Sequence, residues 1–318
     1  MLSETVKEKL QEGDKRSIAR AISIVESGNS ESAEFLKKIY PGTGTAYRIG
    51  VTGPPGAGKS TITNQLTKYY RTLGKKVGII AVDPTSPFTG GALLGDRVRM
   101  SEIGQDPGVF IRSMATRGSL GGLSKKAIDA ADVLDSAGFD FIILETVGVG
   151  QSELDIANAA DTTIVVLVPE SGDAVQAMKA GLMEIADFFV LNKSDRPGSQ
   201  QAVSALKTIL GLKAHDENTW MPTIIKAVAV ENKGIKEIAE EIEKHKDHLL
   251  KKNKFLKRRE ERTKVRIRNI VEEKIREELW SGTGEKSLNS SLNKVVLGNF
   301  SPYHIAEEII NNYKIHNK

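Results

Sequence analysis

The stretch YRIGVTGPPGAGKSTITNQL occupies residues 47–66 and decides the fold. Its first six residues form a mostly apolar run that predicts a buried strand. The next eight, Gly53–Ser60, match the pattern Gly-x4-Gly-Lys-Ser in full, and a helix-length segment follows them. Such a turn points backbone N–H groups at phosphate oxygens, and the helix N-terminus contributes partial positive charge. The stretch therefore predicts a nucleotide phosphate site built from a strand, a loop and a helix.

Two side chains of this loop have individual expected roles. The Lys59 ammonium is expected to reach the β- and γ-phosphates, and the Ser60 hydroxyl to bind Mg²⁺. An ordinary glycine-rich turn is the alternative, but it would require neither the strand before the loop nor the helix after it. We therefore expect the nucleotide to contact the consecutive residues Gly53, Pro54, Pro55, Gly56, Ala57, Gly58, Lys59, Ser60 and Thr61.

Short apolar runs rich in β-branched residues recur along the chain, mostly separated by helix-length segments. A run that is apolar throughout is typical of a strand buried on both faces. Alternation of such strands with helices predicts a parallel sheet covered by helices. The fold class is therefore α/β, a P-loop NTPase with a mostly parallel central sheet and helical N-terminal and C-terminal extensions. The predicted strands are 47–52, 77–82, 109–114, 141–146, 163–168, 188–192 and 223–228.

The tetrapeptide NKSD at residues 192–195 follows one of the last predicted strands. The Asp195 carboxylate can accept hydrogen bonds from both N1–H and the N2 amine of guanine, which adenine cannot supply. We expect Asn192 to tie the loop to neighbouring backbone and the stem of Lys193 to cover the base. A helix cap within the tetrapeptide is the alternative, but the order of the motifs favours guanine, hence GTP and GDP. The residues expected to support the guanine oxygen through a backbone N–H are Val228 and Ala229.

Acidic residues at strand ends and in a glycine-rich segment are candidates for the magnesium side of the site. Asp83 and Glu145 end predicted strands, and Asp96 follows the segment TGGALLG. Mg²⁺ prefers oxygen ligands and retains several waters, so these acids together with Ser60 fit its surroundings. Most GTPases carry Asp where this chain carries Glu145, whose longer side chain favours contact through water. The alternative for each acid is a helix cap or an ordinary loop position.

The segment after Glu145 has the layout of a turn that senses the γ-phosphate, with Gly148, Gly150 and Gln151. Catalysis in this reaction class is positioning plus charge stabilisation, so a residue that orients the attacking water is needed. The sequence does not rank the candidates for that task. The catalytic candidates are Lys59, Asp83, Asp96 and Gln151.

The formal net charge of +4 is unevenly distributed along the chain. Residues 244–268 hold 12 Lys or Arg and 3 Asp or Glu, a net of +9, which leaves 4 − 9 = −5 elsewhere. The segment holds one aromatic residue, Phe255, and lacks the repeated aromatic interleave that base stacking would require, so an assembly arm is favoured over a nucleic-acid or membrane arm. We expect a helical extension at 1–46, a P-loop GTPase domain at 47–243 and a helical, dimerising arm at 244–318.

The composition excludes several other classes of protein. The 318 residues include no cysteine, which removes disulfides, thiolate zinc sites, iron–sulfur clusters and Cys nucleophiles. No stretch approaches the roughly 18 apolar residues of a membrane helix, and the charged N-terminus lacks the apolar core of a secretory signal. We therefore expect a cytoplasmic protein without nucleic-acid or membrane partners. His245 and His248 have an i,i+3 spacing that is typical of a solvated helix face.

Five segments together resemble the MeaB/ArgK-like GTPase family, which includes the methylmalonic aciduria type A protein. The resemblance extends from about residue 13 to 235 and returns near 301–310. It implies a GTP-binding and GTP-hydrolysing chaperone that gates cofactor loading and protection of an adenosylcobalamin-dependent acyl-CoA mutase, such as methylmalonyl-CoA mutase. The segments are GVTGPPGAGKST, AVDPTSPFTGGALLGDRVRM, ETVGVGQSE, GDAVQAMKAGLMEIADFFVLNKSD and SPYHIAEEII.

The same resemblance implies a homodimer formed through the helical C-terminal arms, and it assigns Asp83, Asp96 and Glu145 to the magnesium side. It also implies an additional switch loop that begins at Pro169. Members of the family commonly carry Gly where this chain has Glu170 and Ser171, and Gly permits backbone conformations that these residues resist. The switch residues implied are Gly148, Gly150, Gln151, Asp173, Gln176 and Lys179.

Two other functions belong to related folds. A nickel-insertion metallochaperone GTPase would need Cys or His near the switch loops, and the first His in this chain is His215. A transport-linked ATPase or kinase would need a second substrate site, which no motif indicates, and the base motif favours GTP over ATP.

Overall fold

The computed structural model describes residues 9–10, 12–84, 101–116, 125–146, 155–170, 181–212, 216, 219–281 and 283–316. The chain divides into two compact units, Met1–Phe255 and Leu256–Lys318. The first unit holds the sheet and both nucleotide motifs, and the second unit is helical where it is described.

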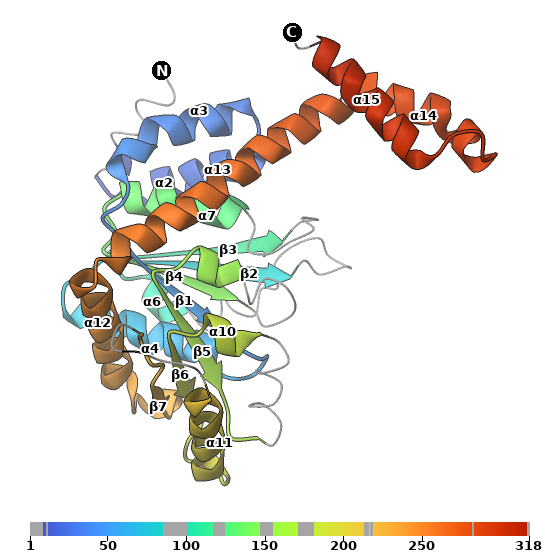
Figure 1. Cartoon of the computed structure of the whole chain (residues 1–318). Helices are drawn as coiled ribbons and strands as arrows, with labels where there is room; N and C mark the ends of the chain where they lie inside the picture. The colour runs from blue at the N-terminus through green and yellow to red at the C-terminus, as the bar shows by residue number, and fades with distance from the viewer. Residues whose placement is uncertain are drawn as a thin grey trace. The chain divides into compact units, whose positions relative to one another are not determined.

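All seven predicted strands form, and every pair of neighbours runs parallel. The order across the sheet is β3-β2-β4-β1-β5-β6-β7, which places β1 between β4 and β5 (Figure 1). The predicted α/β class with a parallel sheet is thereby confirmed. Parallel strands bring their carboxyl ends to one edge, where the loops after β1, β4 and β6 meet. The strands are β1 (Tyr47–Thr52), β2 (Val77–Pro84), β3 (Val109–Thr116), β4 (Phe141–Thr146), β5 (Thr162–Leu167), β6 (Phe188–Leu191) and β7 (Ile224–Lys226).

The two edge strands differ from the expectation of burial on both faces. Ile111 and Arg112 in β3 are only partly buried, and in β7 Ile224 is partly buried while Lys226 is exposed. An edge strand has a neighbour on one side only, so less of its surface is covered. The interior strands β1, β4, β5 and β6 are almost entirely buried, as are residues 77–82 of β2, because sheet neighbours and helices enclose them.

One face of the sheet is covered by α2, α3 and α7 toward the β2 side and by α10 and α11 toward the β6 side. The predicted N-terminal helix is α2, which Asp14 caps by accepting a hydrogen bond from the Ser17 N–H at 2.8 Å and which ends before Gly28 at φ 68°. Its buried apolar side chains recur every three or four residues, so they lie on one face of the helix. They are Ile18, Ala21, Ile22 and Val25. The helices are α2 (Lys15–Ser27), α3 (Ser30–Ile39), α7 (Lys125–Ser136), α10 (Leu182–Ile185) and α11 (Ser199–Gly211).

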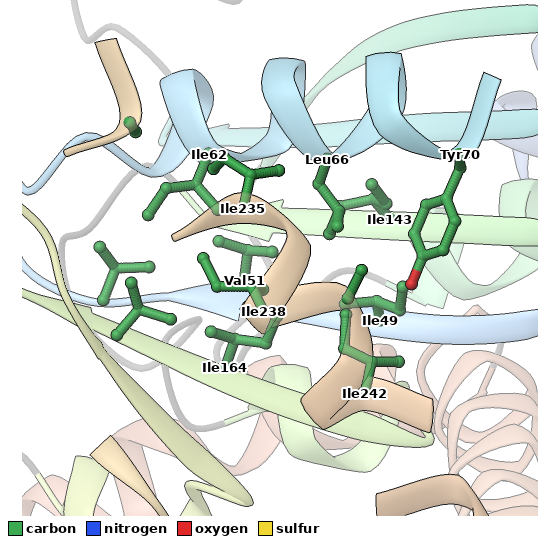
Figure 2. Close-up of a cluster of buried hydrophobic side chains, with 14 of the residues drawn as sticks. Ile49, Val51, Ile62, Leu66, Tyr70, Ile143, Ile164, Ile235, Ile238 and Ile242 are labelled. Carbon is green, nitrogen blue, oxygen red and sulfur yellow. The ribbon is translucent and has the colours of Figure 1, made fainter. Parts of the chain in front are cut away.

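The opposite face is covered by α4 (Lys59–Thr72), α6 (Ser101–Gly104) and α12 (Ile235–Lys251). Figure 2 shows α4 and α12 side by side over the sheet, with their apolar side chains interleaved above the strands. This packing fixes the helix that follows the glycine-rich loop against the centre of the sheet. The interleaved residues include Ile62, Leu66 and Tyr70 of α4, Ile235, Ile238 and Ile242 of α12, and Ile49, Val51, Ile143 and Ile164 of the strands.

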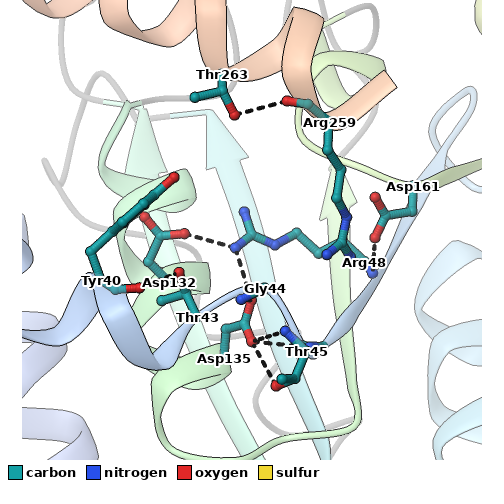
Figure 3. Close-up of polar contacts among 11 residues, drawn as sticks. Tyr40, Thr43, Gly44, Thr45, Arg48, Asp132, Asp135, Asp161, Arg259 and Thr263 are labelled. Carbon is teal, nitrogen blue, oxygen red and sulfur yellow. Dashed lines mark hydrogen bonds and ion pairs between the residues drawn. The ribbon is translucent and has the colours of Figure 1, made fainter. Parts of the chain in front are cut away.

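A buried ion-pair network holds the amino end of β1, opposite the edge that carries the nucleotide motifs (Figure 3). The Arg48 guanidinium donates to Asp132 at 2.7 Å and to Asp135 at 3.3 Å. Asp135 also accepts from the backbone N–H groups of Gly44, Thr45 and Ala46. Buried carboxylates are costly unless they are paired, and here each has a partner. The network joins β1 to α7 and to the loop after the 3-10 helix η1 (Tyr40–Gly42).

The second unit contains most of α13, together with α14 and α15. After residue 234 the chain forms the two long helices α12 and α13, and its last helix begins at Pro302, where the Ser301 hydroxyl accepts from the His304 N–H at 3.2 Å. None of the 27 residues of α13 is buried, and no described helix is long and apolar enough to cross a membrane. The bounds are α13 (Lys254–Trp280), α14 (Thr283–Val296) and α15 (Pro302–His316).

Candidate functional site

The glycine-rich loop follows β1 directly and has a backbone that only glycine fits at two positions. Gly53 has φ 133°, and a Cβ there would lie 2.1 Å from the Val166 carbonyl oxygen in β5. Gly58 has φ 91°, and a Cβ there would lie 2.3 Å from Asn192 Nδ2. The loop is therefore pressed against β5 on one side and the base motif on the other. This close approach fixes its amide groups at the carboxyl edge of the sheet.

Lys59 is the first residue of α4 and points back into the loop. Its side chain is buried at 6% exposure, and Nζ donates to the carbonyl oxygens of Gly53 at 2.8 Å and Pro54 at 3.0 Å. A buried ammonium needs such partners because desolvation is expensive. The lysine is thus held on the concave side of the loop, beside the N-terminus of α4. The ammonium charge and the partial positive charge of the helix end both attract anionic phosphate.

The base motif and the phosphate loop are tied together by Asn192, which is 3% exposed. Its Nδ2 donates to the Ala57 carbonyl at 2.8 Å, and its Oδ1 accepts from the Ala229 N–H at 3.1 Å. The predicted tie between Asn192 and neighbouring backbone is therefore present. Lys193 makes a second link, since Nζ donates to the Gly56 carbonyl at 2.8 Å. One short turn thus connects the phosphate loop, the base motif and the loop after β7.

The surroundings of Asp195 leave its carboxylate exposed at the edge of this assembly. The loop after β7 forms a 3-10 helix, η3 (Ala229–Glu231), so the Ala229 amide expected to support the guanine oxygen is already paired with Asn192. Lys233 lies nearby and donates to Glu231 at 2.6 Å. This hydrogen bond, with the charges of Glu231 and Asp195, raises the pKa of Lys233 above its usual value. Lys233 is therefore protonated at neutral pH, and Glu231 balances its charge.

The magnesium side of the site brings Ser60 and Glu145 together. The Ser60 hydroxyl donates to Glu145 Oε1, although the two residues come from α4 and β4. The register of β1 and β4 places Glu145 opposite Val51, two residues before the loop begins. Glu145 is 1% exposed, and a carboxylate so deeply buried needs polar partners. The hydroxyl and carboxylate oxygens form a donor set that suits Mg²⁺.

Several predicted residues lie outside the described part of the chain. Asp83 belongs to β2, where its backbone pairs in register with Ala115, but its side chain is not among the described ones. The other residues outside the described ranges are Asp96, Gly148, Gly150, Gln151, Asp173, Gln176 and Lys179. Their roles at the γ-phosphate and in the switch segments stay predictions.

Known proteins match this chain along nearly its whole length. The family model described as Methylmalonyl Co-A mutase-associated GTPase MeaB matches residues 18–284. The chain belongs to the MeaB family of GTPases. A Pyrococcus abyssi protein named as a GTPase is 47% identical over 98% of this chain and 96% of its own length. The mitochondrial methylmalonic aciduria type A homolog of Mus musculus is 31% identical over 96% of this chain and 78% of its own length.

A solved structure shares the architecture of this MeaB-family GTPase. It is the crystal structure of a LAO/AO transport system kinase, with a TM-score of 0.74, 28% sequence identity and coverage of 98% of this chain and 97% of that one. This structure confirms the predicted fold class, and the family model and the relatives named as GTPases confirm the predicted GTPase activity. The match of the family model extends through both nucleotide motifs and through α12 and α13.

One hydrogen bond beneath the nucleotide site of this MeaB-family GTPase was not indicated by any sequence motif. Beneath the phosphate loop the Thr146 hydroxyl donates to Thr52 Oγ1 at 2.9 Å, and both residues are fully buried. The pair joins the last residues of β4 and β1, which directly precede the predicted γ-phosphate-sensing segment and the phosphate loop. Threonine is frequent in strands, so its presence at these positions carries no sequence signal. Only the observed register brings the two hydroxyls together.

Proposed function

We propose that this MeaB-family GTPase is a chaperone of an adenosylcobalamin-dependent acyl-CoA mutase such as methylmalonyl-CoA mutase, and that its nucleotide state gates cofactor loading and protects the mutase. The observation that carries the proposal is the match of a mutase-associated GTPase family over residues 18–284. It extends beyond the nucleotide site into α12 and α13, so the likeness is not confined to motifs that all GTPases share.

The geometry of the site supports control of a partner by GTP. Asn192 and Lys193 connect the phosphate loop to the base motif, so binding of the base and binding of the phosphates act on one connected group of loops. Chaperoning by a GTPase requires that the GTP and GDP states differ in free energy of partner binding. The predicted switch segments begin at the ends of β4 and β5, next to these loops.

Mg²⁺ fits the residues present and is proposed as the bound cofactor beside GTP or GDP. Ser60 would bind it directly, and Glu145 would hold it through water, because its carboxylate already accepts from the Ser60 hydroxyl. When bound, the ion would neutralise negative charge on the phosphate oxygens. Lys59 and the loop amides orient the phosphates, and Asp195 selects guanine.

The test uses purified chain and the cobalamin-dependent mutases of its own source cell. Immobilised chain is loaded with a GTP analogue or with GDP, and captured proteins are identified by mass spectrometry. Capture of a mutase that depends on the nucleotide, with faster GTP hydrolysis when the mutase is added, is the expected outcome. Recovery of no cobalamin-dependent mutase in either state would sink the chaperone assignment. Lys59→Ala, which removes the phosphate contact, is the control that should lose nucleotide dependence.

The alternative of a transport-linked ATPase or kinase is separated from GTP use by the base site. Asp195→Asn replaces an acceptor of two guanine hydrogen bonds by an amide that cannot accept both, so the preference for GTP over ATP should fall by a factor on the order of 10–100. Competition binding with the two nucleotides measures the ratio. An unchanged preference would show that the base site is elsewhere. A nickel-insertion function predicts binding of Ni²⁺, which calorimetry measures directly.

A further inference from the structure

Glu170, at the start of the segment after β5, has a specific partner in this structure. Its carboxylate forms an ion pair with the Arg196 guanidinium, and the two side chains are 47% and 48% exposed. Although partial desolvation opposes ionisation, hydrogen bonds from the backbone amide of Glu170 and from Arg196, with the charges of Arg196 and Lys193, lower the pKa of Glu170. The carboxylate is therefore ionised and held toward the base motif at neutral pH.

The two chain segments that carry this ion pair, the one after β5 and the base loop after β6, lie close to each other. The Asn192 N–H donates to the Leu167 carbonyl at 2.8 Å, which aligns the exits of β5 and β6. Further on, a Cβ at Gly198 would lie 3.5 Å from the Pro169 carbonyl oxygen. The segment after β5 thus lies close to the base loop at its first residue and again at the start of α11. The ion pair joins Arg196, which lies between these two contacts on the base loop, to the residue directly after Pro169.

Asp195 lies between an anchored and an exposed part of the loop. On its amino side, Asn192 and Lys193 are fixed by their bonds to the phosphate loop. On its carboxyl side, Arg196 forms a tight turn through its N–H to the Lys193 carbonyl at 3.0 Å, and its side chain reaches Glu170. Residues 195–197 are exposed, so no burial fixes this side. The ion pair is the side-chain contact that restrains it.

We propose that Glu170 and Arg196 are positioning residues that hold the Asp195 carboxylate in place for guanine and so slow the release of the nucleotide. The pair gives the start of the post-β5 segment a defined contact with the base loop. The proposal concerns nucleotide retention by the chain alone, and it stands or falls independently of the mutase.

The experiment measures dissociation of fluorescent mant-GDP and mant-GTP from the full chain, displaced by excess unlabelled nucleotide. Glu170→Gln and Arg196→Gln should each raise the dissociation rate constant about two- to five-fold, the range expected for an exposed ion pair. The double variant should be no faster than the faster single variant, because both changes remove the same contact. Arg196→Lys, which retains the charge, should recover part of the loss. Glu34→Gln, which removes the exposed pair with Lys37, is the matched control and should change nothing.

The Glu170→Gln variant distinguishes loss of the ion pair from a general electrostatic effect of the Glu170 charge on nucleotide binding. Removal of a negative charge near an anionic ligand should by itself tighten binding, whereas loss of the ion pair should loosen it. A slower or unchanged dissociation rate in this variant would overturn the proposal, as would additive effects of the two single changes. The turnover number at saturating GTP should stay at the wild-type value while KM rises, because neither residue touches the reacting phosphates.

Two further readouts separate positioning of Asp195 from mere loop stability. Inosine lacks the N2 amine, so the ratio of mant-IDP to mant-GDP dissociation rates reports the second hydrogen bond of the carboxylate. That ratio should shrink in both single variants and in the double variant. High salt should abolish the difference between wild type and variants, because an exposed pair is screened. A constant ratio or a salt-independent difference would refute the positioning role.

Discussion

Replacement of Asn192 by Ala should destabilise the first unit, because this side chain joins two loops from the interior. It is 3% exposed and bonds the Ala57 carbonyl at 2.8 Å and the Ala229 N–H at 3.1 Å. Both partners belong to buried residues, so truncation leaves a carbonyl and an amide without this contact. Each unsatisfied group costs about 1–3 kcal/mol, and the free energy of unfolding should therefore fall by about 2–5 kcal/mol.

Urea unfolding followed by tryptophan fluorescence measures this change. The chain has two tryptophans, Trp220 in the first unit and Trp280 in the second, so a Trp280→Phe background lets Trp220 report the first unit alone. Asn289→Ala is the control, because Asn289 is exposed on α14 and makes one weak contact at 3.3 Å to a side chain of its own helix. A loss below about 0.5 kcal/mol for Asn192→Ala, the usual range for surface changes, would refute the reasoning.

Gly53→Ala should lower the free energy of unfolding by roughly 3 kcal/mol or more, because its Cβ would lie 2.1 Å from the Val166 carbonyl oxygen. Gly56→Ala, also at positive φ but with nothing within 4 Å of a Cβ, should lose only about 1–2 kcal/mol in the same urea titration, and equal losses would contradict the steric argument. The pKa of Asp106 is lowered chiefly by its hydrogen bond from Arg71, so its contribution to stability is present above the unfolded value of 3.8 and is lost as pH falls through the lower folded value. Asp106→Asn should therefore be less stable than wild type at pH 7, and the difference should shrink on acidification below about pH 4; a constant difference would point to packing instead.

The strands and the phosphate loop were predictable because their signals are local. Seven apolar runs became seven strands, and the order of the strand, the glycine-rich loop and the helix sets the geometry around Lys59. The position of each strand in the sheet was not predictable, since β3 and β7 are edges only because of the order in which all strands pair. The partial exposure of Ile111 and Ile224 follows from that order. The hydrophobic pattern of the two strands does not distinguish them from buried strands.

Charged and polar side chains in the interior were the main departures from sequence-based expectation. His245 was expected on a solvated helix face, yet it is 1% exposed, with Nδ1 2.8 Å from Thr162 Oγ1 and Nε2 3.3 Å from Asp187 Oδ1. Asp132 and Asp135 are likewise buried through their pairing with Arg48. Each residue is buried because its partner arrives from a distant part of the chain. A single sequence shows the residue types but not this pairing.

At the nucleotide site, the sequence indicated which residues take part but not how the loops are joined. The tetrapeptide at 192–195 predicts guanine, and the structure adds that Asn192 uses the Ala229 amide expected to contact the base. The pairing of Glu170 with Arg196 had no motif to indicate it, because the two residues follow different strands, β5 and β6. Such contacts depend on which strands are neighbours, so the sheet order has to be known first.

The exposure of α13 determines how fast its backbone amides exchange hydrogen with solvent. In the centre of the sheet, amides of β1 and β4 open only when the first unit unfolds, so their exchange reports global stability. None of the 27 residues of α13 is buried, so its amides should open by local fraying at a lower free energy than those of the sheet. If this exposed helix serves assembly, its exchange should slow as protein concentration rises, and deuterium uptake along α13 measures that change.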